Sequence, residues 1–548
     1  MVLPKPLGPF HVSYGDFELR GSRDAGESES RAGGDHGHVH PPLFRVYYPT
    51  DGNAVERSEV ERSAWLPHVA YLYGYLCAIV PPFSLLTSIL TWLLSRITYL
   101  LIRPYALIRC LPSRPLISPA SLLRQLTQQD ADSTTPASTD STNGNGSTST
   151  SSRPSTSSGI GSDVSGDGRL PVVLFSHGLW SMRSTYTQFC FDLASHGYVV
   201  VAPEYTDGTA CMAAVTEGQE EEGGKGGVGV KWIPHERMDV EFFEVPMDVR
   251  HRQLQQRMAA LRSTLSLLHQ VNSGQVADAD NAVTGATRLR PSSLSHRLDL
   301  SHIVLAGHSF GGATSAYLAG VAEQPINGFH LSLSPAVQGG DGGGRDGGDS
   351  LVSRVSCVVV LDTWWRPLPD EAQALAGGKA ALLCIDTEGL NAARNVVARK
   401  RFLQGRLASW QERWVQIVKE QEKQEEGEGK EGEEEERKGS GRTDGESGKA
   451  ESATELIVLV GSAHQDPSDL SLVAPGMMKK VKMSGAIPPP IFHRINSTTS
   501  VRFLHQHFPL AKKYRLPVPS ALPEDAVHVQ HVDVPEYVKD WEKIVVSP

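Results

Sequence analysis

The chain has 548 residues, a formal net charge of −10 and six cysteines without CxxC spacing. This length provides a sizeable hydrophobic core, the acidic balance argues against nucleic acid as a partner, and the scattered cysteines favour a reducing compartment. The segment Met1 to Pro6 has neither the apolar core of a secretory signal nor the second-position glycine of a myristoylation signal. We therefore expect no signal peptide and a cytoplasmic location.

Four stretches of the sequence are too polar, and too rich in Gly, Ser or Glu, to bury apolar surface. They cover residues 127–168, 218–229, 338–350 and 420–453, and we expect none of them to form secondary structure. Each one separates two segments with strand-like or helix-like patterns, which is where a fold tolerates added length. We therefore predict a single domain over residues 1–548, interrupted by four inserts.

An uncharged apolar segment runs from Ala70 to Ser95 and is long enough to suggest a membrane span, but Pro81 and Pro82 divide it. Its second part, Phe83 to Ser95, is apolar on nearly every face. This part fits either a buried core helix or a helix that lies in a membrane interface. Its large apolar residues include Leu85, Leu86, Ile89, Leu90, Trp92 and Leu93.

Short, continuous apolar runs recur after residue 170, as in parallel strands that are covered on both faces. A helical pattern, most clearly Arg250 to Val271 with leucines at three- and four-residue steps, separates several of these runs. The alternation predicts a mostly parallel, doubly wound α/β sheet with functional groups at the carboxyl ends of its strands. The predicted strands are Pro171 to Phe175, Tyr198 to Ala202, Ile303 to Ala306, Val355 to Leu361, Ala380 to Ile385 and Leu456 to Val460.

The run Gly307-His308-Ser309-Phe310-Gly311 has the pattern G-x-S-x-G, directly after a predicted strand and before a helical pattern. This context is typical of a nucleophile elbow, in which a strained turn between strand and helix exposes a serine hydroxyl. Backbone N–H groups at the start of the helix favour the negative charge that develops there. We therefore predict that Ser309 is a catalytic nucleophile.

A serine nucleophile needs a histidine to take its proton and a carboxylate to orient that histidine. His464 follows the last predicted strand, which is the usual place of the base in this chain order. Two loops offer an acid: Asp362 ends one predicted strand, and Asp386 and Glu388 end the next. Either loop can reach the histidine, so the residue pattern alone leaves the acid open.

The oxyanion that forms in acyl transfer needs two backbone N–H donors. One is expected from Phe310, the residue after the nucleophile, and the other from a loop after an early strand. An apolar strand leads into His177-Gly178-Leu179, which predicts Leu179 as the second donor. We expect the side chain of His177 to organise this loop rather than to act as a base.

These motifs together resemble the platelet-activating factor acetylhydrolases, a family with the α/β-hydrolase fold. The similarity extends along most of the chain outside the inserts, from Gly8 to Phe508. In two places the chain departs from the family pattern, because Trp180 replaces a glycine and Glu204 to Asp207 replaces a more basic segment. The segments that carry the resemblance are Phe175 to Leu179, Asp192 to Gly197, Gly307 to Thr314, Leu361 to Trp364, Leu43 to Pro49, Ser462 to Gln465 and Ser497 to Phe508.

The resemblance implies calcium-independent hydrolysis of the sn-2 ester of phospholipids that carry an acetyl or short oxidised acyl chain. It implies no cofactor and no metal. Trp180, beside the expected oxyanion donor, would narrow or reshape the acyl pocket. The implied roles are those of nucleophile (Ser309), acid (Asp362, in preference to Asp386), base (His464) and oxyanion donors (Leu179 and Phe310).

Members of this family take lipid from a surface through apolar helices. The resemblance therefore favours the membrane-interface interpretation of Phe83 to Ser95, and with it a peripheral association with membranes. A second segment would make the same contact through Leu472, Val473 and Met477. Two alternatives remain: a carboxylesterase that acts on soluble short-chain esters, and a catalytically silent scaffold that is recruited to membranes.

Overall fold

The computed structural model describes sixteen stretches of the chain, and these support all statements below. Three of the four predicted inserts, residues 127–168, 338–350 and 420–453, lie outside them, and so do Pro81 and Pro82. The single-domain organisation stays a prediction. The described residues are 3–19, 43–50, 63–79, 85–102, 107–108, 116–117, 121, 169–219, 227–236, 246–283, 287–321, 355–368, 380–388, 396–403, 454–519 and 529–532.

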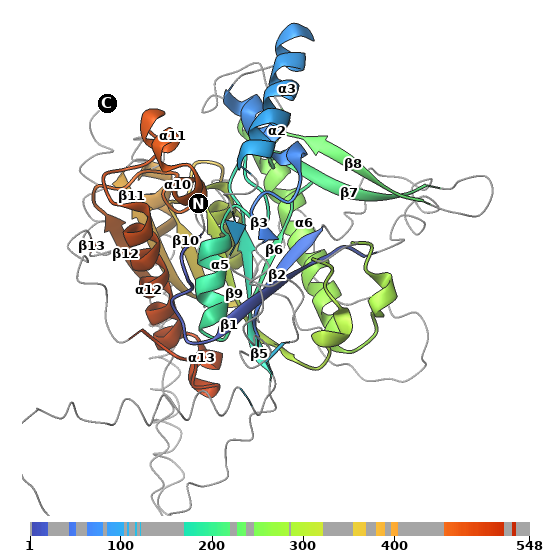
Figure 1. Ribbon diagram of the computed structural model, residues 1–548. Coiled ribbons are helices and arrows are strands. Elements are labelled where there is room, and N and C mark those ends of the chain that lie inside the picture. Colours follow the sequence, from blue (N-terminus) through green and yellow to red (C-terminus); the bar gives the residue numbers. More distant parts are fainter. Residues whose placement is uncertain are drawn as a thin grey trace, which may run out of the picture.

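A nine-stranded sheet forms the centre of the described structure (Figure 1). Six neighbouring strands of this sheet, β6, β5, β9, β10, β11 and β12, are parallel. Strands β2 and β13 pair with the two ends of this parallel set in antiparallel fashion, and β1 pairs with β2. In sheet order the strands are β1 (His11–Phe17), β2 (Phe44–Thr50), β6 (Val199–Pro203), β5 (Leu170–Ser176), β9 (Leu298–His308), β10 (Val355–Leu361), β11 (Ala381–Thr387), β12 (Thr454–Leu459) and β13 (Val529–Val532).

This sheet confirms the predicted mostly parallel α/β architecture, and each of the six predicted strands corresponds to one of its parallel strands. The chain runs from β5 to β6 on one side and then returns to β9 on the other side of β5. The strand order therefore reverses between β5 and β9. Loops diverge at such a switch point and leave room for a site at the carboxyl ends of the strands.

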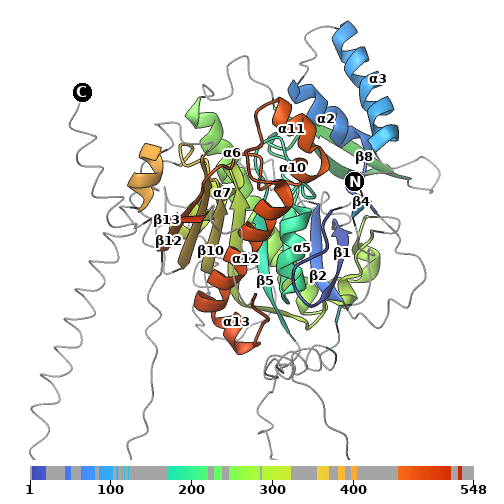
Figure 2. The same ribbon diagram turned by 60° about the vertical axis from the view of Figure 1, so that its left-hand side comes forward.

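Helices cover both faces of the sheet, as expected for continuous apolar strands. In β5, Val172 and Leu174 pack with α6 and α7, whereas Val173 and Phe175 pack with α5 and α12. Figure 2 shows α5 and α12 in front of the strands. The helices are α2 (Val69–Ile79), α3 (Leu85–Ile102), α5 (Thr187–Ser195), α6 (Met247–Asn272), α7 (Phe310–Val321), α10 (Leu470–Val473), α11 (Pro475–Lys480), α12 (Pro489–His507) and α13 (Pro509–Lys513).

The expectation that residues 218–229 lack secondary structure is wrong for part of this insert. Strands β7 (Met212–Gln219) and β8 (Gly227–Pro234) form an antiparallel hairpin whose pairing includes Gly218 with Val228. Glycine-rich sequence gave no apolar signal, yet ladder hydrogen bonds use backbone groups alone and do not need one. A second two-stranded pair, β3 (Ser63–Ala64) and β4 (Leu107–Ile108), is also separate from the main sheet.

Helices α2 and α3 pack against each other, and α3 projects from the body at the end of the molecule that also carries α11 (Figures 1 and 2). A buried polar group holds α2 in place. The Tyr71 hydroxyl donates to Glu204 at 2.8 Å, and Arg183 forms an ion pair with the same carboxylate. Because Arg183 belongs to the loop after β5, this network joins α2 to the loop that carries Leu179.

Candidate active site

The turn between β9 and α7 has the geometry that the G-x-S-x-G pattern predicts. Ser309 has a φ of +56°, a left-handed conformation that is strained for a residue with a side chain. A Cβ on Gly307 would lie 2.4 Å from the carbonyl oxygen of Gly311, and a Cβ on Gly311 would lie 2.0 Å from that of Ser176. The two glycines of the pattern are therefore required sterically, because only they let the strand and helix approach this closely.

The side chains of Ser309, His464 and Asp362 form one continuous chain of hydrogen bonds. The Ser309 hydroxyl lies 3.0 Å from Nε2 of His464, and Nδ1 of the same ring lies 2.6 Å from Oδ2 of Asp362. The Asp362 carboxylate is buried, whereas the His464 side chain is 25% exposed. This arrangement allows the imidazole to take a proton from the serine while the carboxylate fixes its tautomer.

The structure distinguishes between the two loops that could supply an acid. Asp386 is turned to Arg399, with which it forms a buried ion pair, and Glu388 accepts the backbone N–H of Gly461 at 2.9 Å. Only Asp362 of these three contacts His464 among the described residues. The structure therefore favours Asp362, the earlier position, as the candidate acid that the residue pattern left open.

The environment of Asp362 keeps it ionised. Burial acts to raise the pKa of this carboxyl, but the hydrogen bond and the charge of His464, together with the Thr387 hydroxyl, lower the pKa below its ordinary value. Thr387 donates twice, from its backbone N–H to Oδ1 at 2.9 Å and from its hydroxyl to Oδ2 at 2.6 Å. The carboxylate is thus held in position from β11 while it orients the histidine from β10.

His308 is a site residue that sequence reasoning missed, although it is the first variable position of the G-x-S-x-G pattern. Its Nε2 lies 2.8 Å from the backbone oxygen of His464, and its Nδ1 lies 2.8 Å from the Tyr186 hydroxyl. Burial, followed by the nearby charge of His464, lowers the pKa of His308 to about 3. The ring is therefore neutral, so it donates to the His464 carbonyl and accepts from Tyr186, and this fixes the loop of the base.

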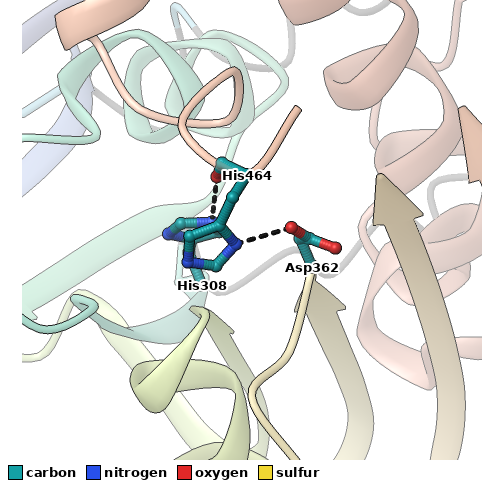
Figure 3. Close-up of side chains that lie close together, drawn as sticks. All are labelled: His308, Asp362 and His464. Atoms are coloured by element: carbon teal, nitrogen blue, oxygen red, sulfur yellow. Dashed lines mark hydrogen bonds and ion pairs between the residues drawn. The ribbon is translucent and has the colours of Figure 1, made fainter. Parts of the chain in front are cut away.

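Figure 3 shows His308 and His464 side by side, with Asp362 on the far side of His464. Their ligand atoms lie within 4.8 Å of one another, a spacing that could hold a metal ion. Every ring nitrogen of the two histidines, however, already has a hydrogen-bond partner. A metal would have to break this network, so proton transfer explains the cluster better than metal ligation does.

The two amides predicted as oxyanion donors belong to Phe310, which directly follows the nucleophile, and to Leu179, which follows Gly178 in the loop beside Ser309. In the part of the chain that the structure describes, no acceptor is found for the N–H of Leu179 or of Phe310, while the N–H groups of Gly178, Trp180 and Ser309 all have partners. Buried N–H groups without partners are rare in folded proteins. Two such groups beside a serine are therefore available to a developing negative charge.

His177 organises the loop of Leu179, as expected. The Nε2 of this buried ring accepts the N–H of Tyr205 at 3.3 Å, so Nδ1 carries the proton and donates to the oxygen of Gly178 at 2.8 Å. Burial and the charge of Arg257 lower the pKa of His177 well below its ordinary value. Arg257 also donates to the backbone oxygen of His177 at 2.6 Å. The loop is therefore anchored from α6.

The predicted lipid-surface residues divide into exposed and buried groups. Leu472 is wrong as a surface residue, since it is only 7% exposed and packs in the core between α10 and α12, and Val473 is half-buried against the same core. The structure does not describe the side chain of Leu85. Met477 and five residues of α3 are exposed: Leu86, Ile89, Leu90, Trp92 and Leu93.

Comparisons with known proteins identify a family to which the chain is similar. The family described as platelet-activating factor acetylhydrolase, isoform II, matches residues 148–517. A platelet-activating factor acetylhydrolase from Gallus gallus is 25% identical over 63% of this chain and 64% of its own length, and one from Bos taurus is 28% identical over 42% and 43%. These alignments span less than two thirds of either relative. A ferulic acid esterase structure from Streptomyces cinnamoneus aligns over 97% of this chain and 99% of its own, at 14% identity and a TM-score of 0.41.

Proposed function

Because this chain belongs to the platelet-activating factor acetylhydrolase isoform II family, we propose that it is a calcium-independent serine esterase for phospholipids with an sn-2 acetyl or short oxidised acyl chain. The observation that carries the proposal is the hydrogen-bonded chain from Ser309 through His464 to Asp362. The two amides without partners beside Ser309 support it, because acyl transfer generates an oxyanion next to the nucleophile.

The acylation step follows from these positions. His464 Nε2 takes the hydroxyl proton of Ser309 while the serine oxygen attacks the sn-2 carbonyl carbon. The carbonyl oxygen becomes an oxyanion that accepts hydrogen bonds from the amides of Leu179 and Phe310. The imidazolium, stabilised by Asp362, then gives its proton to the sn-2 oxygen of the leaving lysophospholipid. The product is a short-chain acyl ester of Ser309.

Deacylation uses the same groups in reverse. His464 takes a proton from a water molecule, the hydroxide attacks the acyl carbon, and the oxyanion returns to the same two amides. The imidazolium then protonates Ser309 as the short carboxylic acid leaves. Charge development at both steps is met by backbone dipoles and the Asp362 carboxylate, so the cycle requires no calcium ion.

Helix α3 supports a substrate that is taken from a lipid surface. Its inward positions include the buried Thr91 and Ser95, while its outward positions carry large apolar residues. This is the reverse of the usual pattern of a surface helix. Within the described ranges, each helix is too short or too polar to cross a bilayer. The exposed apolar residues of α3 are Leu86, Ile89, Leu90, Trp92, Leu93, Leu94, Ile97, Leu100 and Leu101.

We propose that the outward face of α3 lies in the membrane interface, which predicts a binding defect when its leucines become polar. The double variant Leu86→Ser/Leu90→Ser should bind phosphatidylcholine vesicles about 100-fold more weakly or worse, since each leucine loses roughly 1.5–3 kcal/mol of burial. Vesicle sedimentation measures the change. Val518→Ser, at an exposed apolar residue beyond α13, is the matched control. Equal binding by the two variants would contradict the role of α3.

The rival function is that of an esterase for soluble short-chain esters, with α3 uninvolved in substrate access. Hydrolysis of vesicle phospholipids that carry either an sn-2 acetyl or a long sn-2 acyl chain separates the two, in chelator and in added calcium. We expect release of acetate at the same rate in both conditions, little release of the long chain, and no release by Ser309→Ala. Activity on soluble esters alone would favour the rival, and dependence on calcium would overturn the proposed mechanism.

A further inference from the structure

The order of the sheet separates the two sides of the substrate site. Ser309 follows β9, His464 follows β12, and Leu179 follows β5, on the opposite side of β9 from β12. In the proposed reaction His464 must protonate the leaving oxygen, so the lysophospholipid lies toward β12. The acyl chain therefore extends the other way, toward the loops that follow β5 and β6.

Trp180 lies on this acyl side, next to the expected oxyanion donor. A Cβ on Gly178 would come within 3.3 Å of the Cβ of Ser309, so the loop runs directly beside the nucleophile. The Trp180 N–H donates to the oxygen of Thr209 at 2.9 Å, which anchors the residue to the segment after β6. Its half-buried side chain packs against the cores on both faces of the sheet.

The indole of Trp180 is held by a second aromatic ring. His235, directly after β8, stacks on it with 3.7 Å between ring centroids and an angle of 24°. The Nδ1 of His235 lies 3.2 Å from the backbone oxygen of Ala210, which fixes the ring from the β6 side. The residue that follows the hairpin β7–β8 thus supplies one half of a stacked pair of rings, and the other half belongs to the loop that runs beside the nucleophile.

The backbone of Trp180 makes this arrangement unusual. Its φ is +56°, in the left-handed region where glycine is favoured and a tryptophan is strained. A strained residue persists only where its surroundings hold it, and such residues gather at functional sites. This conformation explains why a glycine suits the position. A tryptophan side chain here is therefore expected to have a function that offsets the backbone strain.

We propose that the stacked pair of Trp180 and His235 forms the end wall of the acyl site and restricts the enzyme to short sn-2 acyl chains. This inference rests on the proposed esterase function. The two rings add apolar, rigid surface on the side opposite His464, so an acetyl group fits in front of them and a longer chain meets the indole. Removing the indole should open a path for the longer chain.

The test compares soluble p-nitrophenyl esters from acetate to octanoate, so that membrane binding plays no part. In Trp180→Gly the ratio of kcat/KM for octanoate to that for acetate should rise about 10- to 100-fold, while in Trp180→Phe it should stay within about threefold of the unmodified protein. Glycine suits the φ of this position, so Trp180→Gly relieves the backbone strain but loses the packing of the indole, and thermal unfolding must show that the variant is folded. His235→Ala, which frees the indole, should give an intermediate ratio.

An unchanged ratio in a folded Trp180→Gly protein would overturn the inference while leaving the esterase function intact, provided that the unmodified protein hydrolyses the acetate. If Trp180→Gly does not fold, His235→Ala must still raise the ratio, and an unchanged ratio there would equally overturn it. Absence of hydrolysis of every ester by the unmodified protein, together with no labelling by a fluorophosphonate probe, would instead overturn the proposed function itself.

Discussion

Ser309→Ala is expected to lower kcat for ester hydrolysis by roughly 10⁴- to 10⁶-fold, because no other group can form the acyl-enzyme. The folded structure should persist, since alanine at a φ of +56° is no more strained than serine and only the hydrogen bond to His464 is lost. Steady-state kinetics on an acetyl ester measures the first effect, and thermal unfolding checks the second.

A matched control for this variant lies on the same helix. Ser315, in α7, is buried and donates its hydroxyl to the oxygen of Ala306 at 2.9 Å, away from His464. Ser315→Ala should therefore lose about 0.5–1.5 kcal/mol of stability and keep its reaction with a fluorophosphonate probe. Ser309→Ala should not be labelled. A Ser309→Ala protein with undiminished turnover would rule out this serine as the nucleophile.

The second large effect is expected for Asp362→Asn, with a fall in kcat of about 10⁴-fold. An asparagine amide can donate to Nδ1 of His464, which would place the ring proton on Nε2 and leave no acceptor for the serine proton. It also removes the negative charge that stabilises the imidazolium. The oxygen that accepts from the backbone of Thr387 can be kept, so the fold should tolerate the change.

Asp386→Asn is the matched control, because it makes the same chemical change one strand away. This variant should retain turnover but lose about 3–5 kcal/mol of stability, since the change removes the negative charge that pairs with the buried Arg399. Kinetics and chemical denaturation of both variants measure the two effects. If Asp386→Asn loses turnover while Asp362→Asn keeps it, the acid has been misassigned.

The sheet was predictable because each parallel strand is buried on both faces and therefore reads as a continuous apolar run. The helix at Arg250 to Val271 was predictable for a related reason, since α6 buries one regular stripe of leucines. The hairpin of β7 and β8 was not, because glycine-rich strands at the surface carry no hydrophobic period. Local patterns thus revealed the elements whose side chains build the core.

The sequence by itself indicated Ser309 as the candidate nucleophile and Gly307 and Gly311 as the glycines of its turn. A tight strand-to-helix turn restricts the residue types that fit at these five positions. It also determined His464 as the candidate base through its place after the last parallel strand. These are local constraints, because each depends on residues that are close together in the sequence.

The residue pattern left Asp362 and Asp386 open and only the family resemblance favoured Asp362, because the two residues end neighbouring strands. They differ in what each contacts in the tertiary structure, where Asp362 reaches His464 and Asp386 pairs with Arg399. Only the tertiary structure decided the cases of His308, which reaches the backbone of a residue far along the chain, and of Leu472, which is apolar either way but faces the core. Contacts between distant segments depend on how the layers pack. Residue type and spacing in any single segment do not determine that packing. These contacts could therefore be identified only in the folded structure.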